Sequence, residues 1–255
     1  MKLNKFFFTT LLFFLIASCS SKKNILYVQD IDEIHGYSVK FNQYEIQVDD
    51  ILRIDVSSDN PEANIIFMSN INNLSANSKE TLVYNGYQVN SSGFIYFPII
   101  GKIKAEGKTI EQIRNEIFNL IIDNEILINP FVDVKLLNTH FTILGEVLSP
   151  GRYEYIKNNL NILEAIGMAG DLTINGDRKE IKILRDLDSK TKIFNIDITN
   201  TNFIKNSGFQ IISGDIIIVN PNSNRVKNAG IIGNSGTLLS LLSFILSSII
   251  VISNS

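Results

Sequence analysis

The last 28 residues of the chain, Asn228 to Ser255, contain no charged side chain. Within them, the stretch from Ile231 to Ile252 is apolar apart from interspersed glycine, threonine, asparagine and serine residues. Twenty-two residues of α-helix are roughly 33 Å long, and the hydrocarbon core of a bilayer is about 30 Å thick. The pattern therefore predicts a transmembrane helix over residues 229–252.

The other end of the chain predicts a secretion signal over residues 1–18. Two early lysines precede an apolar run from Phe6 to Ile16, and small residues follow it, as a signal peptidase requires. Ile16-Ala-Ser-Cys19 resembles a lipobox, which implies cleavage before Cys19 and a lipid on that cysteine. The alternative is an ordinary cleaved signal with a chance cysteine. Because Cys19 is the only cysteine of the chain, no intramolecular disulfide can form and the exported part must be held by its cores.

The charge of the chain excludes one class of partner. Loss of residues 1–18 removes two lysines, so the formal net charge of −3 becomes −5, with 21 basic residues against 26 acidic ones. This excludes a broadly basic nucleic-acid binder. Between Cys19 and Lys227 there is room for roughly two domains.

The sequence pattern of the first unit of the middle region predicts a few strands with one helix. Tyr44 to Val56 alternates around Asp49-Asp50 and predicts strand, tight turn, strand. Residues 87–98 predict two short strands around Ser92-Gly93. A capping pair, Thr109 and Gln112, then starts a helix with one apolar face, and Phe131 to Leu136 returns as a strand.

The second unit repeats this pattern. Phe209 to Val219 has the same frame as Tyr44 to Val56, with Asp215 at the place of Asp50. Asn161 and Glu164 form another helix-start pair, and Gly170 can end that helix in a left-handed conformation. The expected fold class is α+β, with two small mixed modules before the terminal helix.

A search for catalytic chemistry finds no complete pattern. Gly107-Lys-Thr109 lacks the glycine spacing of a phosphate-binding loop. His35 and His140 are the only histidines, and neither has metal-ligand spacing to a cysteine. Glu62, Glu146 and Glu154 could meet in space, but nothing favours them over surface carboxylates. We expect a non-enzymatic protein without a metal or cofactor.

The order of these features resembles a family, the Wza-like outer-membrane polysaccharide export lipoproteins. The segments that carry the resemblance to its polysaccharide-export domain are Tyr44 to Val56, Gly93-Phe-Ile-Tyr-Phe-Pro98, Gly101, Gly107 to Thr109 and Asn129-Pro-Phe-Val-Asp-Val134. Those that resemble its soluble-ligand-binding β-grasp module are Leu144 to Val147, Pro150 to Tyr153, Leu163 to Ile166, Ala169-Gly170 and Gly214 to Ile216. Together they cover most of residues 44–221.

Two positions depart from the family pattern. Asp49 stands where the family usually has glycine, and aspartate tolerates positive φ better than most residues, so the turn is expected to form. Asp171 replaces a second glycine after the β-grasp helix. Only one β-grasp module is present, so the resemblance implies a short periplasmic stack.

The terminal helix has one side of small and hydroxyl-bearing residues. Within roughly 140° at 100° per residue lie Gly233, Gly236, Thr237, Ser240, Ser243, Ser247 and Ser248. This side could pack on another helix of a membrane anchor or face a wet lumen in a ring of helices. Arg225 and Lys227 precede the helix on the side of the exported domains. Because this order would conflict with the positive-inside preference of an inner membrane, it favours an outer membrane.

The sequence as a whole predicts an outer-membrane lipoprotein that forms an oligomeric conduit for capsular or exopolysaccharide, with most of the chain in the periplasm. The resemblance implies two partners, the polymer as cargo and an inner-membrane export and chain-length protein. The alternative is a membrane-anchored periplasmic scaffold or carbohydrate-binding lipoprotein without a pore. The expected parts are a signal peptide (1–18), an N-terminal extension (19–43), an export domain (44–137), a β-grasp domain (138–222) and the terminal helix (229–252).

Overall fold

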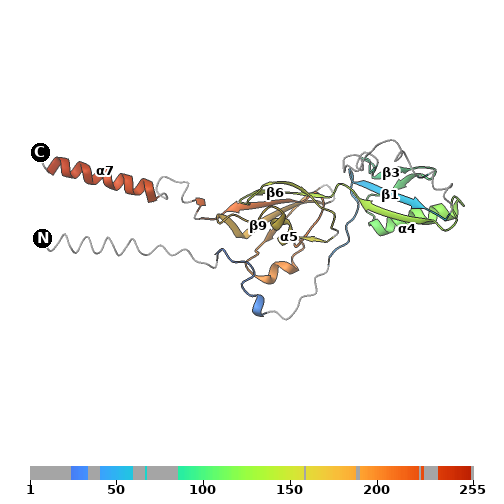
Figure 1. The fold of residues 1–255 in the computed structure, drawn as a ribbon, viewed down its shortest axis with the longest axis horizontal. Coiled ribbons are helices and arrows are strands. Elements are labelled where there is room, and N and C mark those ends of the chain that lie inside the picture. Colours follow the sequence, from blue (N-terminus) through green and yellow to red (C-terminus); the bar gives the residue numbers. More distant parts are fainter. Residues whose placement is uncertain are drawn as a thin grey trace.

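The fold is seen in a computed structural model that describes residues 24–33, 41–59, 67, 86–157, 159–187, 190–223, 225–226 and 235–253. It contains two α+β modules, each with its own hydrophobic core, and a separate C-terminal helix (Figure 1). The predicted signal peptide, Cys19 and Glu62 lie outside the described residues.

The first module is built on a three-stranded antiparallel sheet in the order β2-β1-β5. Its strands are β1 (Ile51–Ser57), β2 (Tyr87–Gln88) and β5 (Phe131–Leu136), and a separate hairpin joins β3 (Phe94–Phe97) to β4 (Gly101–Lys104). The prediction of a strand over Phe131 to Leu136 is confirmed.

Helix α4 (Ile110–Asp123) covers this sheet and supplies much of the first core. The Thr109 hydroxyl accepts the N–H of Gln112, and the Gln112 side chain accepts the N–H of Thr109, so the predicted capping box is confirmed. Ile113, Ile117 and Ile121 are fully buried. Each such side chain contributes about 1.5–3 kcal/mol relative to an exposed one.

The second module contains a five-stranded mixed sheet in the order β10-β9-β12-β6-β7. The strands are β6 (His140–Gly145), β7 (Gly151–Glu154), β9 (Gly176–Leu187), β10 (Lys190–Ile196) and β12 (Ile216–Pro221). Strands β12 and β6 run parallel, and the other neighbours are antiparallel. A small second pair is formed by β8 (Leu160–Asn161) and β11 (Gln210–Ile211), and the module also holds the 3-10 helix η4 (Thr201–Lys205).

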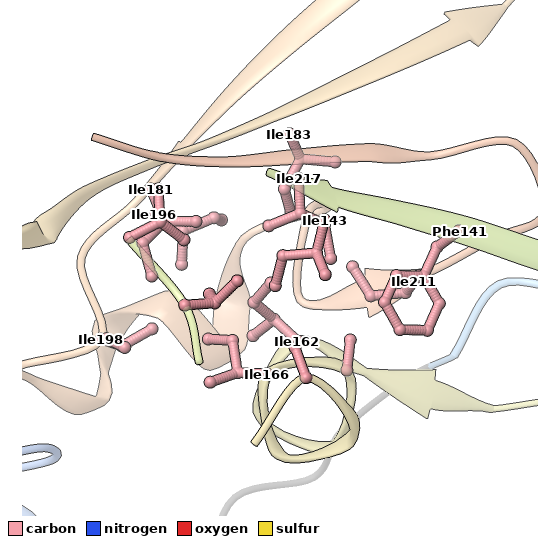
Figure 2. Packing of buried hydrophobic residues seen from close by; sticks show 14 of the residues in the cluster. Phe141, Ile143, Ile162, Ile166, Ile181, Ile183, Ile196, Ile198, Ile211 and Ile217 are labelled. Atoms are coloured by element: carbon pink, nitrogen blue, oxygen red, sulfur yellow. The ribbon is translucent and has the colours of Figure 1, made fainter. Parts of the chain in front are cut away.

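Helix α5 (Ile162–Met168) packs on this sheet and begins at the predicted capping box of Asn161 and Glu164. Figure 2 shows Ile143, Ile183 and Ile217 of the sheet pointing toward Ile162 and Ile166 of the helix. After the helix, Gly170 and Asp171 both adopt positive φ, at 80° and 83°. The left-handed helix end at Gly170 is therefore confirmed, and Asp171 takes the same conformation.

The segment before the first module packs on the second one. The backbone N–H of Val28 donates to the carbonyl of Ile198 at 3.0 Å, and that of Gln29 donates to Thr199 at 2.8 Å. The short 3-10 helix η2 (Ile31–Glu33) follows and lies beside the second module in Figure 1. The chain thus contacts the second module first, builds the first module, and then returns.

Strand, tight turn and strand were predicted around both Asp50 and Asp215. The second repeat has this order, in β11 and β12, whereas in the first a strand is described only after the turn, in β1. In neither repeat do the two arms pair as a hairpin. The residues before Asp50 form only an isolated bridge, from Glu45 to Thr109, and β11 and β12 pair with other strands and not with each other.

Each turn makes its closing bond, in which the carbonyl of the first residue accepts the N–H of the fourth: Asp50 donates to Gln47 and Asp215 donates to Ile212, both at 3.2 Å. In a two-residue hairpin the N–H of the first residue would also donate to the carbonyl of the fourth. Here it donates to the carboxylate of the fourth residue instead, and the two arms separate toward different partners.

The turn predicted at Ser92-Gly93 is present, but its flanking strands separate as well. Asn90 donates its N–H to the carbonyl of Phe94 at 2.9 Å, and its side chain accepts the N–H of Ser92. Strand β2 pairs with β1, whereas β3 pairs with β4.

The structure describes the C-terminal helix α7 over Ser235–Ser253, and residues 229–234 of the predicted helix lie outside the described residues. These 19 residues make about 28 Å of helix, and six of them are serine. Among the residues that the structure describes, no helix has the length and apolar character of a membrane span. The prediction of a transmembrane helix over 229–252 is therefore corrected.

Candidate functional site

The two modules meet around two equivalent turns, at residues 47–50 and 212–215. In the first, the Gln47 N–H donates to Asp50 Oδ2 at 2.8 Å, and the carbonyl of Asp50 accepts the N–H of Val89 at 2.8 Å. In the second, Ile212 donates to Asp215 Oδ2 at 2.9 Å, and the Asp215 carbonyl accepts the N–H of Thr142 at 2.9 Å. The repeated frame seen in the sequence is thus a repeated turn.

The residue ahead of each aspartate has positive φ, which closes the turn. Asp49 has φ of 69° and Gly214 has φ of 89°. The expectation that Asp49 would tolerate the conformation of the family's glycine is confirmed. Its carbonyl also accepts a hydrogen bond from the Asn138 side chain at 3.0 Å, which ties this turn to the segment that enters the second module.

Asp215 forms a buried ion pair with Arg185. The guanidinium donates through Nε and Nη2 to the two carboxylate oxygens, at 2.8 and 2.7 Å. It also donates to the carbonyls of Ser207 and Gln210. Burial raises the pKa of Asp215, while Arg185 and the N–H of Ile212 act in the opposite direction. The pair joins strand β9 to the turn before β12.

Asp50 has the same turn geometry, but its side-chain partner is a phenol. Tyr44 Oη donates to Asp50 Oδ2 at 2.8 Å. Burial raises the pKa of Asp50, and the hydrogen bonds of Gln47 and Tyr44 and the charge of His140 oppose this shift. Burial also raises the pKa of Tyr44, and its hydroxyl lies close to Tyr155 and Ser213. Tyr44 therefore connects the first turn with the second module.

A pocket of about 540 Å³ lies at this junction. One wall is the segment from Asn42 to Val48 with Glu106, and the other wall includes Arg185, Lys192 and Gln210. Gln210 holds the two walls together, because its amide accepts the N–H of Asn42 at 2.8 Å and donates to the Asn42 carbonyl at 2.9 Å. Sequence reasoning missed this pocket, since its walls are far apart in the chain and its polar residues form no local motif.

The predicted membrane or lumen residues lie in a different part of the structure. Gly236, Ser240, Ser243 and Ser247 are exposed on α7, Thr237 belongs to the same helix, and Gly233 and Cys19 lie outside the described residues. Ser243 Oγ donates to the Leu239 carbonyl at 2.8 Å, and Ser248 Oγ donates to the Phe244 carbonyl at 2.9 Å. The junction pocket and the α7 residues are two separate candidate sites.

The carboxylates considered for catalysis have structural partners where they are described. Glu146 accepts a hydrogen bond from the Thr173 hydroxyl at 2.6 Å, and Arg225 lies 3.9 Å from it. His140 Nδ1 lies 2.9 Å from the carbonyl of Asn138. Within the described ranges, no three histidine, cysteine or acidic side chains are grouped as metal ligands would be.

Comparison with known proteins identifies the first module. Residues 39–137 match the family model described as polysaccharide biosynthesis/export protein. The chain is also similar to the EPS I polysaccharide export outer membrane protein EpsA of Ralstonia solanacearum, with 28% identity over 201 residues, or 75% of this chain and 51% of the relative. It is 33% identical over 105 residues to EpsA of Ralstonia nicotianae, which is 40% of this chain and 27% of that protein.

The chain spans about half the length of the first of these relatives and less of the second. The matched family consists of transport proteins and not of enzymes, in agreement with the non-enzymatic prediction. The family match covers the first module, including the Asp50 turn, and the longer alignment extends over most of the chain. Residues 39–137 therefore match the polysaccharide export family that the sequence resembles, and the similarity to EpsA extends over 75% of the chain.

Proposed function

We propose that this protein is an outer-membrane lipoprotein whose copies assemble into a ring through which a capsular or exopolysaccharide leaves the cell. The observation that carries this proposal is the match of residues 39–137 to the export family, together with the similarity to EpsA, which is named as an outer membrane export protein. The β-grasp reading of the second module fits the same proposal, since its strands and helix follow the order expected for that module.

Assembly is supported by the exposed apolar side chains of α7. Leu239, Leu241 and Ile245, which lie off the small-residue side of the helix, are 66, 49 and 53% exposed in the single chain. Apolar side chains left open to this degree on one helix favour contact with another surface. In the proposed ring, the α7 helices of neighbouring copies cover each other.

The small-residue side of α7 faces the interior of this ring. Gly236, Ser240, Ser243 and Ser247 recur at intervals of four, three and four residues, which is the spacing of one helix face. The hydroxyl of Ser243 donates within its own helix, so it offers the passing polymer mainly its acceptor lone pairs. Contacts of this kind are weak, and a conduit must release its cargo as readily as it admits it.

Two further parts of the proposal lie outside the described residues or outside this chain. A lipid on Cys19 would hold each copy at the membrane. An inner-membrane export and chain-length protein would deliver the polymer to the periplasmic modules. Neither attachment requires catalysis by this chain.

The proposal is tested by removing residues 229–255 from the protein in cells. Surface polysaccharide should be lost, while circular dichroism and thermal unfolding of the purified variant should show both modules folded. Normal export by the truncated protein would contradict the conduit.

A second variant separates the conduit from an anchored scaffold. Residues 235–253 are replaced by a leucine-rich helix of the same length, which keeps an apolar helix but removes its small residues. The conduit predicts loss of export, whereas a scaffold whose helix serves only as an anchor would tolerate the replacement.

A further inference from the structure

The junction pocket combines a rigid frame with polar side chains that have no partner. Small-molecule sites occur preferentially between domains and use a small number of placed polar groups. The frame is fixed by the paired hydrogen bonds between Gln210 and Asn42 and by the Gln47 N–H on Asp50. The pocket walls therefore keep their shape before anything binds.

Several polar side chains around the pocket are available to a ligand. Gln43, Glu45, Gln47 and Ser207 line it, and within the described part of the chain their side chains make no hydrogen bond or ion pair. A carboxamide offers two donors and an acceptor, a carboxylate offers acceptors, and a hydroxyl offers both. This mixture suits a ligand with many hydroxyl groups, because each hydroxyl both donates and accepts.

The charges of the pocket favour an uncharged ligand. Arg185 is neutralised by Asp215 at 2.7 Å, and Glu106 is paired with Lys104 at 2.6 Å. Asp186 accepts a hydrogen bond from Thr191 and adds one negative charge at the rim. Glu45 and Lys192 contribute one charge of each sign. A strongly acidic polymer would thus find no surplus of positive charge.

Two aromatic residues line the pocket, Tyr44 and Phe194, and both already have partners; Tyr44 donates its hydroxyl to Asp50. Phe194 lines the pocket, but its ring already contacts two cations, with Arg185 Cζ at 5.1 Å and Lys192 Nζ at 5.2 Å from the centroid. The remaining apolar wall includes Val48, Leu187 and Ile212. Recognition would rest on hydrogen bonds, each of which contributes about 0.5–1.5 kcal/mol net, so binding should be weak.

We infer that the pocket between the modules binds a short, uncharged stretch of the exported polysaccharide. This inference rests on the proposed function, since it assigns the pocket to the same cargo. A weak site at the junction would hold the polymer transiently on its way along the protein without stopping its passage.

The test measures binding by saturation-transfer NMR on the full-length protein in detergent. The probe is the uncharged fraction of di- to hexasaccharides released by partial hydrolysis of the polysaccharide that the cells export, and the acidic fraction of the same hydrolysate is the comparison. We expect saturable millimolar binding of the uncharged fraction. The variants Gln47→Ala and Lys192→Ala should each weaken it about five- to tenfold.

Lys190→Ala is the matched control, because Lys190 lies on the same strand as Lys192 but outside the pocket. It should bind as the wild type does. Absence of binding by the uncharged fraction, a preference for the acidic fraction, or unchanged binding in both pocket variants would overturn the inference.

An export assay separates this inference from the proposed function. If cells without the protein lose surface polysaccharide but the purified protein binds no fragment, the pocket assignment fails and the export role stands. If cells without the protein export normally, the proposed function fails whatever the pocket binds.

Discussion

The carboxylates of Asp50 and Asp215 each accept the backbone N–H of the residue three positions earlier, at 2.8 Å from Gln47 and 2.9 Å from Ile212. Both aspartates then lead into a strand of a different module, β1 or β12. The two modules therefore contain the same kind of turn. They differ in the side chain that donates a hydrogen bond to the carboxylate, which is the phenol of Tyr44 at Asp50 and the guanidinium of Arg185 at Asp215.

The first prediction concerns the positive φ of these turns. Gly214→Ala should destabilise the protein by about 1 kcal/mol, because a Cβ at Gly214 meets no atom within 4 Å and only the left-handed backbone conformation penalises it. Asp49→Gly should stabilise the protein, but by less than Gly214→Ala destabilises it. The gain is small because aspartate tolerates this backbone conformation and because its side chain accepts a hydrogen bond from Gln88, which the variant loses. Urea unfolding measures both.

Gly151→Ala is the control for this pair. A Cβ there also meets no atom within 4 Å, but the φ of Gly151 is not positive. Its stability should change little. An equal loss for Gly151→Ala and Gly214→Ala would show that the turn conformation is not the cause.

The second prediction concerns the buried pair of Arg185 and Asp215. Asp215→Asn should destabilise the second module by about 3 kcal/mol, because it leaves the Arg185 charge buried without a counter-charge. Asp186→Asn, at an exposed neighbour on the same strand, should change the free energy of unfolding by less than about 0.5 kcal/mol. Similar losses in the two variants would contradict this account.

The third prediction concerns the pH dependence caused by Asp50. Burial raises its pKa in the folded protein, so its contribution to stability is fully present below the unfolded-state pKa. That contribution is lost as the pH rises through the folded-state pKa. Asp50→Asn removes this loss of stability, because an asparagine does not ionise. Tyr44 and Gln47 both donate to one oxygen, Oδ2, so the amide oxygen of the asparagine can still accept both hydrogen bonds.

Unfolding free energies at pH 3 and pH 7 test this. The variant should resemble the wild type at pH 3 and be more stable at pH 7. Asp55→Asn is a control, since Asp55 lies on β1 and is half-exposed beside Arg53. A variant at Asp50 that is less stable than the wild type at pH 7 would mean that the charged carboxylate is favoured there.

The local elements were predictable from the sequence because their signals are local. The two predicted capping boxes are present in the structure, Thr109 with Gln112 and Asn161 with Glu164. The alternation of apolar and polar residues predicted strand β5 with its correct bounds. The pairing around Asp50 and Asp215 was not predictable by the same means. Alternation shows which side chains are buried, but it does not show that a carboxylate takes the place of the hairpin's carbonyl.

The junction pocket was hidden from the sequence for a related reason. Gln210 is an ordinary polar residue in a hydrophobic segment, and only the fold brings its amide to the backbone of Asn42, 168 positions away. The terminal helix shows the limit of counting apolar residues. The sequence predicted a membrane span over residues 229–252, but among the described residues no helix has the length and apolar character of one.

The fourth prediction concerns the proposed lipid at Cys19. Cys19→Ser should leave the mature protein without acyl chains, so its intact mass should lack them and the protein should leave the membrane fraction. Export should fall, because the copies would no longer be gathered at the membrane. Membrane retention and export equal to the wild type would contradict the lipid anchor.

The central claim is that copies of this chain form a closed ring, and native mass spectrometry tests it most directly. The detergent-extracted, lipidated protein is compared with a version that ends at Lys227. The account predicts a single closed oligomer of many subunits for the full-length protein and a weaker assembly for the shortened one. A monomer or dimer of the full-length protein under gentle extraction would contradict the conduit.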